Sequence, residues 1–77
     1  MKRSPLTDPC SGDVLEFYNS INGYTWVCIV DTVQDGMVHV SYPRVEYPVC
    51  REALIPLICW EMDCIRNNAR VVKCSWQ

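Results

Sequence analysis

Between residues 13 and 42, three short runs of strand-forming residues alternate with two turns that contain Gly. The runs are DVLEFY (13–18), YTWVCIVD (24–31) and MVHVSY (37–42), and the turns are NSING (19–23) and TVQDG (32–36). β-Branched and aromatic residues favour strands, whereas Gly after Asn or Asp favours a tight hairpin turn. The pattern therefore predicts an antiparallel meander of three strands.

Residues of a strand alternate between its two faces, so each run has an apolar face and a mixed face. In the first run Leu15 and Phe17 share one face. The third run divides into Val38, Val40 and Tyr42 on one face and Met37, His39 and Ser41 on the other. His39 is therefore expected to face solvent as an ordinary surface histidine.

Prolines organise the segment after the meander. Pro43 and Pro48 bracket the sequence RVEY. Because proline cannot donate to a sheet ladder, this bracket is predicted to be a loop or an edge rather than a central strand. The run VCREALI (49–55) that follows is predicted to be a fourth strand.

A short helix is predicted over residues 57–67. Pro56 suits the first turn of such a helix, where its missing N–H is harmless, and the Asn67-Asn68 pair is a plausible stop. The run ARVVKC (69–74) then predicts a closing strand.

Two apolar stripes follow the predicted helix. Leu57, Trp60 and Cys64 form one stripe at helical spacing, and Ile58, Met62 and Ile65 lie close to another. Trp60 is the largest residue of the first stripe, so it is expected to face the sheet and to be buried.

The order of elements predicts a mainly β fold, a small SH3-like barrel of about five antiparallel strands with one short helix before the last strand. Partial closure would protect the edges of so short a sheet. The alternative is an α+β arrangement, a curled antiparallel sheet with the helix packed on one face. With 77 residues the chain forms one domain. Residues 1–12 are predicted to be an arm and 13–77 the domain.

The six cysteines lack the spacing of a metal knuckle. They lie 18, 22, 9, 5 and 10 positions apart, and no C-x2-C pair occurs. On a helix, Cys59 and Cys64 would be separated by ~140°. We therefore expect core and surface thiols, with a structural disulfide or a metal site as the alternatives. No metal and no cofactor is predicted.

Catalytic patterns are absent from the sequence, so we do not expect an enzyme. A cysteine nucleophile would need a base, and His39 is the single histidine. Glu61 and Asp63 are two positions apart on the helix and are read as part of a solvated face. The net charge is −2, and the sequence contains no basic run longer than Lys2-Arg3. Both observations argue against a nucleic-acid-binding surface. The start of the chain carries no signal-peptide core, and no apolar run could span a membrane, so a cytoplasmic location is predicted.

The two ends of the chain resemble small proteins encoded by tailed bacteriophages and prophages. The similarity lies in the opening SPLTDPCSGDVLEF and in the Trp-bearing helix followed by NARVV, and it does not extend to SYPRVEYPVCREA. That family has no assigned activity and lends no catalytic residues. The resemblance implies a small accessory protein that acts in the cytoplasm of a bacterial host.

Aromatic residues and arginines mark the candidate binding sites. Our first hypothesis is a phage-encoded protein-binding module that occludes a host enzyme or an antiviral defence complex, since Tyr, Trp and Arg are enriched at interface hot spots. The predicted protein-binding residues are Arg44, Tyr47, Trp76, Tyr18, Tyr24 and Trp26. The alternative is a purely structural role, in which Trp26 and Tyr42 fill the barrel. The second hypothesis is a nucleic-acid-binding SH3-like barrel that uses Tyr24, Trp26 and Arg70.

Overall fold

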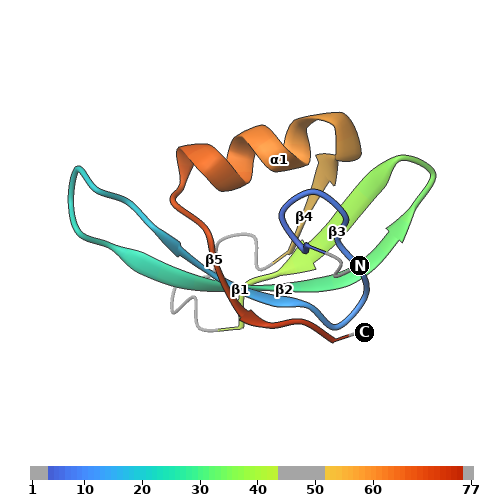
Figure 1. Cartoon of the computed structure of the whole chain (residues 1–77), viewed down its shortest axis with the longest axis horizontal. Helices are drawn as coiled ribbons and strands as arrows, with labels where there is room; N and C mark the ends of the chain where they lie inside the picture. Colours follow the sequence, from blue (N-terminus) through green and yellow to red (C-terminus); the bar gives the residue numbers. More distant parts are fainter. Residues whose placement is uncertain (1–3, 44–51, 76–77) are drawn as a thin grey trace.

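The computed structural model describes residues 4–43 and 52–75 and contains, within them, one antiparallel sheet and one helix (Figure 1). The elements are β1 (Val14–Tyr18), β2 (Thr25–Gln34), β3 (Met37–Ser41), β4 (Glu52–Pro56), α1 (Leu57–Arg66) and β5 (Arg70–Lys73). The five strands form one sheet in the order β4-β3-β2-β1-β5. The prediction of a mainly β fold with five antiparallel strands and a helix before the last one is confirmed.

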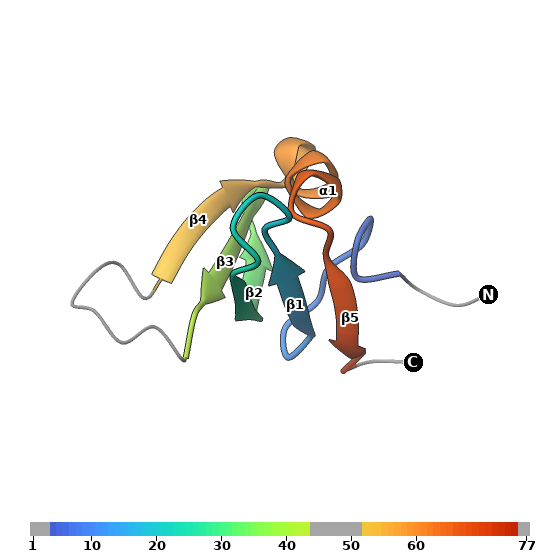
Figure 2. The same cartoon turned by 90° about the vertical axis from the view of Figure 1, so that its left-hand side faces the viewer.

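The sheet is open, because the described strands β4 and β5 form its two edges and do not pair with each other. It curls, and α1 lies over one face, which we call the inner face (Figures 1 and 2). The structure thus has the curled-sheet form of the predicted fold rather than a closed barrel. The chain leaves β4 directly for α1, so the helix crosses the inner face between the two edges and covers it.

Strand β2 is longer than the sequence pattern indicates. Residues 32–34 were assigned to a loop but continue the strand, and the turn to β3 is only Asp35-Gly36. Both turn residues have positive φ, 54° and 74°, as the tightest hairpin turns require. Pro56 also differs from the prediction. Its extended backbone ends β4 and precedes the helix, instead of opening the first turn.

The strand registers confirm the predicted faces. Leu15 pairs with Cys28, and Val30 pairs with Val40, all pointing to the inner face. Together with the helix they build the core. Its buried members are Leu15, Phe17, Cys28, Val30, Val38, Val40, Trp60 and Cys64.

A β-bulge interrupts the pairing of β2 with β3. Val30 pairs with Val40 and Thr32 with His39, so Asp31 is the extra residue. Its carboxylate Oδ1 accepts a hydrogen bond from the Ser41 hydroxyl at 3.2 Å. Because a bulge adds one residue to one strand, Val33 returns to the inner face and Thr32 to the outer face, the one turned away from α1.

The described part of the predicted arm, residues 4–12, packs on the core instead of extending from it. The indole Nε1 of Trp60 donates a hydrogen bond of 2.8 Å to the carbonyl oxygen of Pro5. Pro5 and Pro9 are both buried. The arm therefore closes the space between the helix and the sheet.

Asp13 joins the arm to the end of β5. Its carboxylate is fully buried, and it accepts hydrogen bonds from the backbone N–H of Cys10 (2.8 Å) and of Ser75 (2.9 Å). Gly12 permits this close approach, since a Cβ there would lie 2.9 Å from the Cβ of Ser75, and its φ of +94° favours glycine. The turn predicted from SGD is thus a tight junction of two distant segments.

Candidate functional site

Two of the predicted binding aromatics lie together at the β1–β2 hairpin. The rings of Tyr24 and Trp26 stack with centroids 5.7 Å apart, and Trp26 meets Phe17 edge-on at 5.5 Å. Phe17 pairs with Trp26 across the strands, so Trp26 belongs to the inner face, where it is partly buried against the core. The Tyr24 ring stacks on that of Trp26 and is itself mostly exposed.

Tyr18 does not join this cluster. It pairs with Thr25, one position out of phase with Trp26, and therefore belongs to the opposite face of the sheet. Its backbone ties the hairpin to the segment after α1. The N–H of Tyr18 donates to the carbonyl of Asn67, and its carbonyl accepts from the side-chain amide of Asn68. The predicted binding residues Tyr18, Tyr24 and Trp26 therefore do not share one surface.

The other three predicted residues, Arg44, Tyr47 and Trp76, lie outside the described residues. Their role in binding stays a prediction. Tyr42, the residue proposed to fill the interior with Trp26, is partly buried against the core. Burial raises the pKa of its phenol, with the neighbouring Cys28 and Asp63 adding to the shift.

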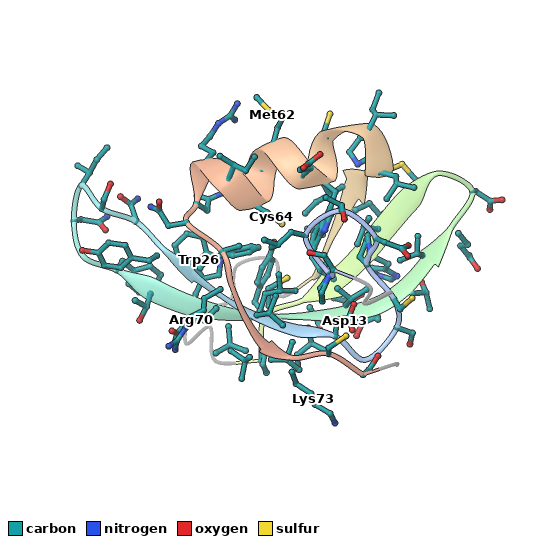
Figure 3. The ribbon with its side chains drawn as sticks, viewed as in Figure 1. Asp13, Trp26, Met62, Cys64, Arg70 and Lys73 are labelled. Atoms are coloured by element: carbon teal, nitrogen blue, oxygen red, sulfur yellow. The ribbon has the colours of Figure 1, made fainter. Side chains whose placement is uncertain are left out.

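The two faces of α1 are both apolar, and only one of them is buried. Trp60 and Cys64 are each 1% exposed and face the sheet, as predicted for Trp60. Ile58, Met62 and Ile65 are 92%, 60% and 63% exposed. At ~100° per residue they fall within an arc of ~60° on the opposite side of the helix. Figure 3 shows Met62 pointing away from the sheet and Cys64 toward it. We call Ile58, Met62 and Ile65 the outer stripe.

The β1–β2 hairpin rises on the same side of the sheet as α1, near the C-terminal end of the helix (Figures 1 and 2). Its loop carries Ile21, which is 94% exposed. The outer stripe and the hairpin loop therefore present large apolar side chains on one side of the molecule. The spacing of the outer stripe is visible in the sequence, but its exposure and that of Ile21 are not.

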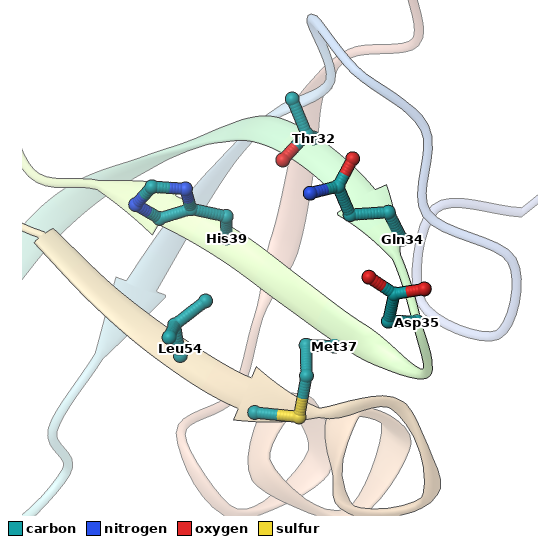
Figure 4. Close-up of a pocket in the computed structure, with 6 residues that line it drawn as sticks. All are labelled: Thr32, Gln34, Asp35, Met37, His39 and Leu54. Atoms are coloured by element: carbon teal, nitrogen blue, oxygen red, sulfur yellow. The ribbon is translucent and has the colours of Figure 1, made fainter.

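The outer face of the sheet holds a separate pocket of about 200 Å³ near the β2–β3 turn (Figure 4). It is lined by Thr32, Gln34, Asp35, Met37, His39 and Leu54. Just beyond it, the Nε2 atom of His39 lies 3.1 Å from Oε1 of Glu52. His39 is on the outer face, as predicted, with its side chain more than a third exposed.

The described thiols and the histidine do not form a nucleophile–base pair at the core. Cys28 and Cys64 lie on the inner face, across the sheet from His39. Burial raises the pKa of both thiols to about 12, with Cys64 adding to the shift of Cys28 and Asp63 to that of Cys64. These two thiols are therefore protonated at neutral pH and serve as apolar core groups. Cys10, Cys28, Cys59 and Cys64 are free thiols.

A metal site would need several ligands in one place. Within residues 4–43 and 52–75, no group of three or more His, Cys, Asp or Glu side chains is arranged to hold an ion. The same residues include no helix long and apolar enough to cross a membrane.

Basic side chains are few on the described surface. Arg70 donates to Glu16 at 2.7 Å on the outer face, and Arg66 lies 3.9 Å from Asp63 on the helix. Arg70 of β5 pairs with Glu16 of β1 and therefore belongs to the outer face, whereas Trp26 belongs to the inner face. The structure therefore does not bring Arg70 together with Tyr24 and Trp26 as the nucleic-acid hypothesis requires.

Comparisons with known proteins add no family to this picture. No family model matches the chain, and no curated protein or solved structure is significantly similar to it. The resemblance to phage proteins stays a hypothesis.

Proposed function

We propose that this protein is a protein-binding module that presents the outer stripe of α1 to an apolar groove on a partner protein. The observation that carries the proposal is the exposure of Ile58, Met62 and Ile65 on a helix whose opposite face is fully buried. Scattered single apolar residues are common on protein surfaces, but a grouped set at helical spacing is typical of an interaction site.

The spacing of the stripe supports a particular mode of recognition. The positions i, i+4 and i+7 are those by which an amphipathic helix inserts into a hydrophobic groove. Here the helix is already anchored, since Trp60 packs in the core and its indole is held by the Pro5 carbonyl. A fixed helix loses little conformational entropy on binding, which favours affinity.

The proposed partner is a bacterial host protein, and the proposed consequence is occlusion of its surface. This part rests on the resemblance to phage-encoded accessory proteins. A host enzyme or an antiviral defence complex would fit that setting. The Pro-bracketed residues Arg44 and Tyr47, together with Trp76, are a second candidate contact in the same proposal.

The test begins with capture of the partner from a bacterial lysate and its identification by mass spectrometry. Affinity is then measured by calorimetry with both purified proteins. Ile65→Gln should weaken binding by about 2 kcal/mol, the size expected of a hot spot, which is about 30-fold in Kd. The matched control is Val72→Gln, whose parent side chain is similarly exposed (57% against 63%) but lies on β5. It should bind as the parent does.

Unchanged affinity in a folded Ile65→Gln variant would contradict the helix assignment. Loss of binding in an Arg44→Ala, Tyr47→Ala double variant alone would move the contact to the bracketed loop. Binding of DNA or RNA with a steep decrease on adding salt would instead favour the nucleic-acid alternative.

A further inference from the structure

The pocket on the outer face is built from two rows of cross-strand neighbours. One row is formed by Thr32, His39 and Leu54, since His39 pairs with Thr32 on one side and with Leu54 on the other. In the next row Gln34 pairs with Met37. Thr32 and Gln34 lie on the outer face because the bulge at Asp31 shifts β2 by one residue relative to β3. The pocket is thus part of the sheet, with Asp35 added by the turn (Figure 4).

The polar rim of the pocket offers several hydrogen-bond acceptors. Asp35 contributes a carboxylate, Gln34 an amide oxygen and Thr32 a hydroxyl oxygen. In the described part of the chain, no Lys or Arg pairs with Asp35, and the side chains of Thr32 and Gln34 make no hydrogen bond there.

Among residues 4–43 and 52–75, the carboxylates in and beside the pocket have no lysine or arginine near them. Asp35, in the β2–β3 turn, lies in the pocket, and Glu52, on β4, lies beside it. The described basic residues, Arg66, Arg70 and Lys73, belong to the end of α1 and to β5 at the far edge of the sheet. The pocket is therefore complementary to a cation, and no described cation of the chain neutralises it.

The remaining lining is apolar and suits the stem of a long side chain. Met37 and Leu54 supply it, and Leu54 is largely exposed beside the opening. A planar guanidinium carries five N–H donors in a fixed fork on an aliphatic stem, so it matches several acceptors and an apolar wall at once. An ammonium group is a compact charge with three donors and matches fewer of them.

We propose that the outer-face pocket binds an arginine side chain presented by a partner, with the guanidinium on Asp35 and the acceptors of Thr32 and Gln34, and the aliphatic stem against Met37 and Leu54. This site lies on the opposite side of the sheet from the outer stripe and does not depend on the proposed function of the helix. The protein would then have two separate contact surfaces.

The experiment uses the full ¹⁵N-labelled chain and N-acetyl-L-arginine amide, followed by amide chemical shifts. Saturable shifts are expected for the residues that line the pocket, with a Kd on the order of 1 mM. N-acetyl-L-citrulline amide has nearly the same shape without the charge and should bind at least ten-fold more weakly. N-acetyl-L-lysine amide should also bind more weakly than the arginine probe.

Asp35→Asn should weaken the arginine probe at least five-fold while keeping the turn, because Asn also tolerates positive φ. The control is Glu61→Gln, which removes an exposed carboxylate from the helix and should leave the affinity unchanged. The proposal is overturned by shifts that do not saturate, by shifts that lie outside the pocket, or by equal binding of citrulline or lysine. Full affinity in a folded Asp35→Asn variant would overturn it as well.

Discussion

The two faces of α1 carry similar amounts of apolar side chain and have opposite surroundings. Trp60 and Cys64 are fully enclosed by the sheet and the N-terminal arm, whereas Ile58, Met62 and Ile65 are exposed to solvent. Burial of apolar surface stabilises a fold, and exposed apolar surface contributes almost nothing to it. The difference teaches that only one of the two apolar faces stabilises the domain. The other face is the one that we propose binds a partner.

The strongest test of this comparison is Trp60→Ala against Met62→Ala. Removing the buried indole should lower the free energy of unfolding by about 3–5 kcal/mol, because the transfer energy is lost and a cavity remains. The Met62 variant should stay within about 0.5 kcal/mol of the parent. Urea unfolding followed by circular dichroism measures both. A Trp60→Ala variant as stable as Met62→Ala would show that the two faces do not differ.

A finer substitution, Trp60→Phe, isolates the hydrogen bond on the buried face. Phenylalanine keeps most of the apolar bulk but cannot donate to the Pro5 carbonyl, which leaves that acceptor unpaired. We expect a loss of about 1–3 kcal/mol. An additional double variant, Trp60→Phe with Pro5→Ala, tests how far the packing of Pro5 holds the arm on the helix. If Trp60→Phe is neutral, packing alone fixes the arm on the helix.

Two thiols on the same helix give a third contrast, because Cys64 is buried and Cys59 is exposed. The folded-state pKa of Cys28 and Cys64 is about 12, above the ordinary value of 9.0. Their stabilisation is therefore complete below pH 9 and is lost as pH rises toward 12, because the unfolded thiols ionise first. Between pH 8 and 10 the loss should be about 1 kcal/mol per thiol.

The measurement for these thiols is the melting temperature as a function of pH. Cys28→Ala with Cys64→Ala should be less stable than the parent at neutral pH, but its melting temperature should fall less steeply above pH 9. In addition, iodoacetamide at pH 8 should label Cys59 in the folded protein and spare Cys64. Rapid labelling of Cys64 without unfolding would contradict its enclosure.

The smallest effect on stability is expected on the outer stripe. Ile58→Gln and Ile65→Gln should each change the free energy of unfolding by no more than about 0.5 kcal/mol, since neither side chain packs in the core. Thermal melting of both variants checks this. A large loss would mean that these side chains stabilise the fold, as those of the buried face do.

The fold could be predicted to a large extent because its signals are local. The alternation in VLEFY and MVHVS assigns the inner face correctly, and Trp60 at helical spacing is predicted to face the sheet. The open edges could not be predicted in the same way. Closure depends on whether β4 and β5 meet, which is a non-local pairing that neither strand's sequence reports.

The candidate sites were harder to predict than the strands. Periodicity shows that Ile58, Met62 and Ile65 share a face of the helix, but exposure depends on which layers surround it. The outer-face pocket needs Leu54 beside His39 and Thr32 across the bulge, and both contacts follow from pairings set in three dimensions. The face on which Tyr18 lies relative to Trp26 likewise depends on the hairpin register.

The buried carboxylate of Asp13 has a consequence for the timing of folding. It needs the N–H of Ser75, a residue 62 positions later in the chain. A ribosome releases Asp13 and the β1–β2 hairpin well before Ser75, and during that interval the carboxylate stays hydrated, since burying it unpaired would be costly. The β1–β2 hairpin therefore cannot reach its final packing until Ser75 has been synthesised. Because contacts between distant residues slow folding, we expect this junction to form late.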